Sequence, residues 1–348
     1  GLSFLLLGCC YFLAYCSFVI HLRSNPSVFQ HIALRGKSRP PISKSAQVKR
    51  VRKAENDTWT KTVRLYYSAS SNYSDYLQWM EKINKTHSSP IRLSLSFLPP
   101  KQSFTVMITE DGDRISAKFN NTVSLMHLYH ETFRVNTVVF TNSSVIAQFA
   151  KRKGLNVQPV FHSNSYGFPE LKWLLIRARE LYPANQYIFI NSDILINPFL
   201  FHMAYQLDAM LKKTSPHYLL ASNVFKTLTI PTIDFSSMDR FMQSFQSLAG
   251  YRRATVAIDL FVFDGQYPFE ELNSVVVGRF YVDSEVMRYS HVHQMPIVDL
   301  SFLQSFHQGL TVSNELKGVV DPQNLEYNRP LLGSFDVNDT VLSSSYFV

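Results

Sequence analysis

Residues 136–190 read NTVVFTNSSVIAQFAKRKGLNVQPVFHSNSYGFPELKWLLIRARELYPANQYIFI. Three short runs in this stretch are apolar, and between them apolar residues recur at helical spacing. We expect strands at 136–140, 157–161 and 187–190, and helices at 143–153 and 170–181. Strands that alternate with helices through short connections predict parallel pairing with right-handed crossovers.

The same alternation continues on both sides of this stretch. The further expected elements are a strand at 104–108, a helix at 123–133, a helix at 198–213, and strands at 218–221 and 257–263. We therefore predict an α/β domain over residues 96–348, built on a mixed, mostly parallel sheet with helices on both faces.

The N-terminal part differs in character from this domain. Residues 2–22 carry no charged side chain, and about 20 apolar residues span a bilayer as a helix. We predict a transmembrane signal-anchor at 1–22, with a cleaved signal peptide as the alternative. Residues 23–95 contain Pro40-Pro41 and many Ser and Lys residues, and they read as a basic stem or linker.

The indicators of membrane orientation disagree. The positive charges follow the apolar segment, which by the positive-inside rule places the stem in the cytosol. Six N-glycosylation patterns favour the lumen instead, and they begin at Asn56, Asn72, Asn84, Asn120, Asn142 and Asn338. We expect a single-pass glycoprotein of the Golgi or endoplasmic reticulum membrane, with its domain in the lumen.

Composition excludes several functional classes. The net charge of +8 comes almost entirely from nine Lys or Arg residues between Arg23 and Lys53, a segment without acids. Such a run is typical of a solvated or membrane-proximal linker, so we expect no nucleic-acid partner. The sequence has no Cys-x-x-Cys, His-Glu-x-x-His, Walker or Gly-x-Ser-x-Gly motif. It therefore lacks the signature motifs of the commonest alternative enzyme classes.

A polar triplet, Asn191-Ser192-Asp193, directly follows the strand expected at 187–190. Ligands of parallel sheets bind beyond the carboxyl ends of the strands, and a carboxylate there is costly without a partner. Mg²⁺ and Mn²⁺ prefer oxygen ligands and often bind one or two carboxylates plus diphosphate oxygens. We predict that the triplet binds a diphosphate and that Asp193 ligates the metal. The alternative is that Asp193 turns the chain before the next helix.

Charged residues of the second half are candidates for the rest of the site. Asp259 interrupts the apolar run AIDLFVF, and GRFYVDSE contains Arg279, Asp283 and Glu285. A base for an acceptor hydroxyl is needed if a group transfer inverts configuration, and Asp283 or Glu285 is the candidate. Arg279 is a candidate phosphate partner, and Asp259 a further residue of the cofactor site. The alternatives are acids of a helix first turn and a structural ion pair.

His307, in Phe306-His307-Gln308, is the candidate second metal ligand. An imidazole at the end of the domain could complete the metal shell that Asp193 begins. The alternative is a histidine whose bonds are satisfied in the core or at the surface.

The order of these motifs resembles the nucleotide-diphospho-sugar transferase superfamily with the GT-A fold. In the first half the resemblance is carried by VVFTNSSVIAQFAKRKGLNVQPV, FPELKWLLIRAREL and YIFINSDILINPF. In the second half IDLFVF, VVVGRFYVDSEV, PIVDLS and FHQG are similar to one poorly characterised group within that superfamily. The similarity spans about residues 103–330.

The resemblance implies roles for individual residues. Asp193 would lie at the metal and diphosphate site, Asp259 on the donor or acceptor wall, and His307 at the position of a late histidine that can ligate the metal. Asp283 would stand where the group has the aspartate of a D-N-W-L motif. Asn328 matches a Tyr-Asn pair near the end of the group's pattern.

Two positions depart from that pattern. The D-N-W-L motif is replaced by residues 283–286, DSEV, which lack the aromatic ring and the amide and so put acceptor recognition in doubt. Asn142 stands after the second expected strand, where the group often carries an acid near the nucleotide.

These observations favour a metal-dependent glycosyltransferase that moves a sugar from a nucleotide-diphosphate donor to a glycan or glycoprotein, with Mn²⁺ or Mg²⁺ as cofactor. A non-catalytic, membrane-anchored glycan-binding or scaffold protein on the same fold is the alternative. A phosphohydrolase or nucleotidyltransferase is the third reading, since it would also use a metal and a diphosphate.

Overall fold

The computed structural model describes residues 103–252, 258–309, 327–333 and 346–347, all of which belong to the compact unit Arg92–Val348. The signal-anchor predicted at 1–22 and the stem predicted at 23–95 lie outside the described residues. Within the described ranges, no helix combines the length and apolar character that a membrane crossing requires.

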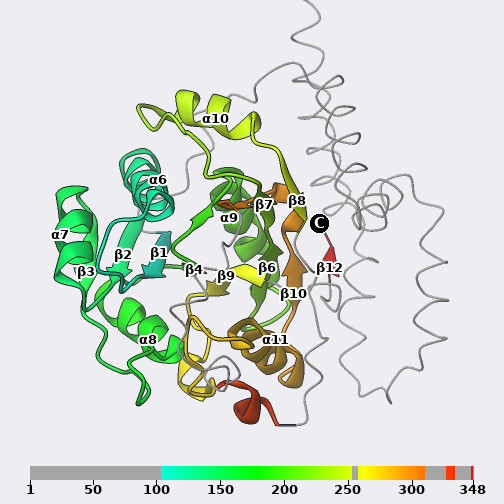
Figure 1. Ribbon diagram of the computed structural model, residues 1–348. Helices are drawn as coiled ribbons and strands as arrows, with labels where there is room; N and C mark the ends of the chain where they lie inside the picture. Colours follow the sequence, from blue (N-terminus) through cyan, green and yellow to red (C-terminus); the bar gives the residue numbers. More distant parts are fainter. Residues whose placement is uncertain (1–102, 253–257, 310–326, 334–345, 348) are drawn as a thin grey trace, which may run out of the picture. The chain divides into compact units, whose positions relative to one another are not determined.

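An eight-stranded sheet forms the centre of the domain, in the order β12-β10-β6-β9-β4-β1-β2-β3 (Figure 1). Its strands are β1 (Phe104–Thr109), β2 (Asn136–Phe140), β3 (Asn156–Gln158), β4 (Gln186–Ile190), β6 (Leu219–Asn223), β9 (Ile258–Asp264), β10 (Ile297–Asp299) and β12 (Tyr346–Phe347). Only β9 runs antiparallel to its neighbours, β4 and β6. The predicted mixed, mostly parallel sheet is confirmed, and the carboxyl ends of its other strands share one edge with the start of β9.

Helices cover both faces of this sheet, as predicted. They are α6 (Ala117–Phe133), α7 (Ser144–Arg152), α8 (Leu171–Leu181), α9 (Phe199–Leu211), α10 (Met238–Gln246) and α11 (Val282–Val292). In Figure 1, α8 and α11 lie below the sheet, and α6 lies above it. Edge-on ring contacts of Tyr129 with Phe201 and Phe241 join α6 to α9 and α10 on the upper side. A mixed, mostly parallel sheet between two layers of helices fits the GT-A-like fold that the sequence resembles.

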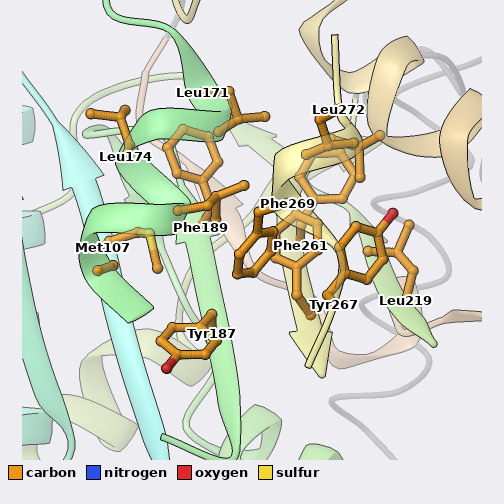
Figure 2. Packing of buried hydrophobic residues seen from close by; sticks show 14 of the residues in the cluster. Met107, Leu171, Leu174, Tyr187, Phe189, Leu219, Phe261, Tyr267, Phe269 and Leu272 are labelled. Carbon is orange, nitrogen blue, oxygen red and sulfur yellow. The ribbon is translucent and has the colours of Figure 1, made fainter. Parts of the chain in front are cut away.

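The lower face holds a large apolar layer between the sheet, α8, α11 and the short helix η2 (Phe269–Glu271). Figure 2 shows this layer, with Leu171 and Leu174 of α8 drawn close to Phe189 of β4. All three side chains are at most 3% exposed. Burial of this kind contributes about 1.5–3 kcal/mol for each large apolar side chain. It fixes the plane of the sheet from which the loops of the site emerge.

A second, four-stranded sheet has the order β5-β11-β7-β8. Its strands are β5 (Ile194–Leu195), β11 (Phe306–His307), β7 (Phe225–Thr227) and β8 (Gly250–Arg252). The antiparallel pairing of β5 with β11 sets His307 opposite Ile194, the residue after Asp193. This sheet therefore brings together His307 and Asp193, which were predicted to share a site, although the sheet itself was not predicted.

The helix expected at 123–133 begins at Ala117 instead, two turns earlier. Ser116 caps it through a hydrogen bond from the Phe119 backbone N–H. Its first turns bury Lys118 and Thr122, polar residues that obscured the helical pattern. The helix at 238–246 was not expected either, although Ser237 caps it in the same way.

Candidate functional site

Polar side chains from distant parts of the chain meet at the carboxyl edge of the large sheet. The Ser192 hydroxyl donates to Glu110 Oε2 at 2.6 Å, which joins the ends of β4 and β1. The Asn191 amide donates to Asp259 Oδ1 at 2.8 Å, which joins the end of β4 to the start of β9. Of the predicted site residues, Asn191 and Asp259 are thus joined by a direct hydrogen bond, and Ser192 is fixed by Glu110.

The backbone of Asp193 is fixed by the late His-Gln motif. Its carbonyl oxygen accepts from the Gln308 backbone N–H at 3.1 Å and from Gln308 Nε2 at 3.2 Å. Gln308 is fully buried and also donates to the carbonyl of Lys118 and the hydroxyl of Thr122. The glutamine of the late His-Gln pair therefore connects helix α6 to the loop after β4.

The side chain of Asp193 is 23% exposed and faces two basic groups. His307 Nε2 lies 2.9 Å from Asp193 Oδ2, and Lys118 Nζ lies 3.8 Å from the same oxygen. Both basic side chains are at most 9% exposed. The carboxylate is thus partly accessible and electrostatically supported, which suits a residue that receives a charged ligand.

Asp193 and His307 fit two ligands of one divalent cation. Two ligands at adjacent octahedral positions, each about 2.1 Å from the metal, lie about 3 Å apart, and the observed separation is 2.9 Å. No cluster of three or more His, Cys, Asp or Glu ligands occurs among the described residues, so other ligands would have to come from substrate and water. Lys118 already offsets part of the Asp193 charge, which weakens binding of a metal alone.

Asp283 lies beside Asp259 at the same edge. Its Oδ2 atom accepts from the Ile258 backbone N–H at 3.2 Å, at the start of β9. Burial, with the neighbouring Asp259 charge adding to it, raises the pKa of Asp283 to about 6, and the hydrogen bond from Ile258 opposes this change. A carboxyl with this pKa is largely ionised at neutral pH and still basic enough to accept a proton.

Glu285 has a different environment, although it shares the first turn of α11 with Asp283. It is fully buried and accepts two hydrogen bonds from Arg288, at 2.7 and 2.9 Å. It also accepts from the Asn273 backbone N–H at 2.9 Å. A carboxylate satisfied in this way holds α11 to the preceding loop, so the geometry favours Asp283 over Glu285 as a base.

Arg279 contacts an aromatic ring. Its guanidinium carbon lies 3.4 Å from the centre of the Phe168 ring, and Nη1 donates to the Gly278 carbonyl. Burial lowers the pKa of Arg279, and its Nε atom has no hydrogen-bond partner in the described part of the chain. Arg279 forms no ion pair with Asp283 or Glu285 among these residues, so its predicted phosphate contact remains a prediction.

Asn328 supports the loop that precedes α11. It is fully buried, accepts from the Val276 N–H at 2.8 Å, and donates to the Val276 and Phe280 carbonyls at 3.0 and 2.9 Å. Tyr281, the next residue, has a φ of 69°, which non-glycine residues seldom adopt. Asn328 therefore fixes this loop by hydrogen bonds and so positions the start of α11 and Asp283.

Replacement of Asn328 by alanine is expected to lower the free energy of unfolding by about 3 kcal/mol, because three buried backbone groups lose their partner. Chemical denaturation of the purified domain measures this. Asn185→Ala, at an exposed asparagine, is the matched control and should change stability by less than about 0.5 kcal/mol. Equal effects of the two substitutions would show that Asn328 does not stabilise the loop before α11.

Asn142 connects the ends of β2 and β3 through its amide group. It accepts from the Val160 N–H at 3.0 Å and donates to the Val160 carbonyl at 3.3 Å. The Asp111 carboxylate accepts from the backbone N–H groups of Asn142 and Ser143 at 2.7 and 3.2 Å, at the start of α7. Asn142 stands where the group that the sequence resembles carries an acid, and here its side chain joins the ends of two strands. The carboxylate at this place belongs to Asp111, in the loop after β1.

Sequence reasoning missed Glu110, Lys118 and the bonding role of Gln308. Glu110 had a usable signal, because it directly follows the first strand. Lys118 had none, because a lysine on a helix is ordinarily a solvated residue. Only the packing of α6 against the second sheet brings its ammonium group to Asp193.

No known family model matches the sequence, and no curated protein matches it. The structure is similar to mannosyl-3-phosphoglycerate synthase from Rubrobacter xylanophilus, with 14% identity and a TM-score of 0.38 over 77% of this chain and 87% of that chain. A putative nucleotide-diphospho-sugar transferase from Desulfovibrio desulfuricans has 7% identity and a TM-score of 0.34 over 66% and 97%. A CMP:2-keto-3-deoxy-manno-octonic acid synthetase has 8% identity and a TM-score of 0.34 over 62% and 96%. Similarity at this level concerns the architecture alone.

Proposed function

We propose that this protein is a metal-dependent glycosyltransferase that uses a nucleotide-diphosphate sugar. The observation that carries the proposal is the joint placement of Asp193 and His307, 2.9 Å apart, at the same sheet edge as the Asp259 and Asp283 carboxylates. A site of this kind offers a place for a diphosphate and, beside it, a base for an acceptor hydroxyl.

In this proposal each side chain of the site has a separate role. Asp193 and His307 hold a divalent cation, which supplies positive charge to the leaving diphosphate. Lys118 adds a buried positive charge next to Asp193 and stabilises the same developing negative charge. Asn191 and Ser192 bind their neighbours Asp259 and Glu110 and so keep the loop in place before substrate arrives.

Asp283 is the proposed base. It accepts the proton of the acceptor hydroxyl while that oxygen attacks the anomeric carbon of the sugar, and the bond from this carbon to the diphosphate breaks. Direct displacement of this type inverts the anomeric configuration. We further propose that the acceptor is a glycan or glycoprotein, and that residues 1–22 anchor the enzyme in a Golgi or endoplasmic reticulum membrane with its domain in the lumen.

A thermal-shift assay with Mn²⁺, UDP and GDP tests the proposal. Two protein ligands leave most of the metal shell to a diphosphate, so metal and nucleotide should bind together. We expect Mn²⁺ plus the correct nucleotide to raise the Tm by about 5 °C or more, and each one alone to raise it far less.

His307→Ala is the variant for the same assay, and it should abolish the joint shift. Ca²⁺ in place of Mn²⁺ serves as a control for non-specific charge effects, because its longer bonds suit this pair of ligands poorly. The proposal fails if no nucleotide shifts the Tm at any metal concentration. Hydrolysis of the donor without transfer to any acceptor would favour a phosphohydrolase.

A further inference from the structure

A pocket lies on the lower face of the sheet, beside the edge strand β3 and its neighbour β2. It has a volume of about 370 Å³ and lies between Phe140, the loop after β3 and one side of α8. Asp193 follows β4, two strands away from β2, and its partners Lys118 and His307 come from α6 and the second sheet. This hollow, which we call the α8 pocket, is therefore lined by other residues than those of the candidate transfer site.

Exposed aromatic rings line the α8 pocket. Phe161 is 62% exposed and Trp173 is 36% exposed, although both are large apolar side chains. The His162 ring stacks on Trp173 with 4.2 Å between ring centres and 19° between planes. The Arg177 guanidinium carbon lies 5.4 Å from the centre of the Phe161 ring. These contacts hold the rings in place before any ligand binds, which lowers the entropic cost of binding.

The polar groups of the α8 pocket form a donor and acceptor pair. Arg177 Nη1 donates to Glu180 Oε2 at 3.0 Å, one turn along α8. Arg177 Nε is buried and has no hydrogen-bond partner within the described ranges. Arginine offers only donors and an ionised glutamate only acceptors, so the pair suits a ligand whose groups both donate and accept. Hydroxyl groups have this property.

We propose that the α8 pocket binds a sugar ring of a glycan. The apolar C–H face of a pyranose packs on an exposed aromatic ring, and its hydroxyls complete the hydrogen bonds of Arg177 and Glu180. An alkyl chain would offer no hydrogen bond to the Arg177 and Glu180 side chains, and Glu180 disfavours a phosphate. The volume is near the lower end for small-molecule sites, about 300–1,000 Å³, which suits a short glycan segment. The inference stands on the pocket alone and requires no transfer activity.

Saturation-transfer NMR on the full chain tests this proposal, with methyl α-mannoside, lactose and N-acetylglucosamine as probes and uridine as the comparison. We expect saturation of ring C–H protons for at least one sugar and none for uridine. Trp173→Ala and Arg177→Ala should each weaken that binding about ten-fold or more, since a lost stacking or hydrogen-bonding contact is of this size. Leu228→Ala removes a similarly exposed apolar side chain elsewhere and should leave the binding unchanged.

The thermal unfolding of each variant shows whether it is folded. Phe161→Ala replaces Trp173→Ala if the latter does not fold, since Phe161 is the more exposed ring. The proposal is overturned by absence of sugar binding, by binding that these variants leave unchanged, or by uridine binding that Trp173→Ala removes. If Trp173→Ala loses sugar binding but its Tm still rises with Mn²⁺ plus nucleotide, the α8 pocket and the proposed transfer site are independent of each other.

Discussion

Asp193→Asn is expected to lower kcat/KM for sugar transfer by about 10³-fold, which corresponds to about 4 kcal/mol of lost transition-state stabilisation. Asparagine keeps the shape of the side chain but removes the charge that faces His307 and Lys118. The Lys118 ammonium group then repels a divalent cation that no carboxylate offsets, and His307 is left as the remaining member of the proposed ligand pair. Transfer is measured with the sugar nucleotide whose nucleoside diphosphate gives the largest thermal shift.

Glu131→Gln is the matched control, because it also removes one negative charge, from an exposed position in the last turn of α6. It should leave kcat/KM within about two-fold, as surface changes away from a site generally do. Asp193→Asn should retain the unfolding cooperativity of the parent chain. Full transfer activity in folded Asp193→Asn would remove the basis of the enzyme assignment.

Asp283→Asn should lower kcat by about 10²–10⁴-fold, the contribution of a positioned general base. The pKa of Asp283 is raised to about 6, so the carboxyl is protonated and inactive as a base below that pH and ionised above it. In the parent enzyme kcat/KM should therefore rise with pH through about 6 and then level off. In Asp283→Asn this acid limb should disappear from the residual activity.

Asp239→Asn provides the matched control, since Asp239 is an exposed acid in the first turn of another helix, α10. It tests whether loss of a helix-terminal charge by itself changes the rate. The joint thermal shift by Mn²⁺ and nucleotide should persist in Asp283→Asn, because the metal ligands are untouched. A pH profile that keeps its limb near 6 in Asp283→Asn would assign the base to another residue.

Much of the first half of the domain could be predicted from local signals. Val, Ile and Phe runs predicted β2 and β4, and helical spacing predicted α7, which Ser143 caps and which ends shortly before the left-handed Gly154. Each signal acts within a few residues, through strand propensity, a cap hydrogen bond or a left-handed glycine. The second half was predicted less well, because β5, β7, β8 and β11 have at most three residues each and exist only through pairing with one another.

The residues of the candidate site also differ in whether local sequence or tertiary structure reveals them. Asn191, Ser192 and Asp193 were predicted because a polar triplet after a buried strand has a defined place in a parallel sheet. Asp283 and Glu285 could not be separated by sequence, since both are acids in one helical turn. Their environments differ because Arg288 and Asn273 satisfy Glu285, whereas Asp283 lies beside the Asp259 charge.

The sequence by itself determined the class of fold and predicted the edge of the sheet where a ligand would bind, because the alternation of strands and helices follows from local pattern and the position of the strand ends from chain direction. Tertiary structure brought the predicted pair of Asp193 and His307 into contact, and it alone added Lys118 to them. Lys118 and His307 reach Asp193 only because α6 and β11 pack against the loop after β4. Charges separated by 75 and 114 residues in the chain interact when folding brings them within a few ångströms, and no local pattern records that distance.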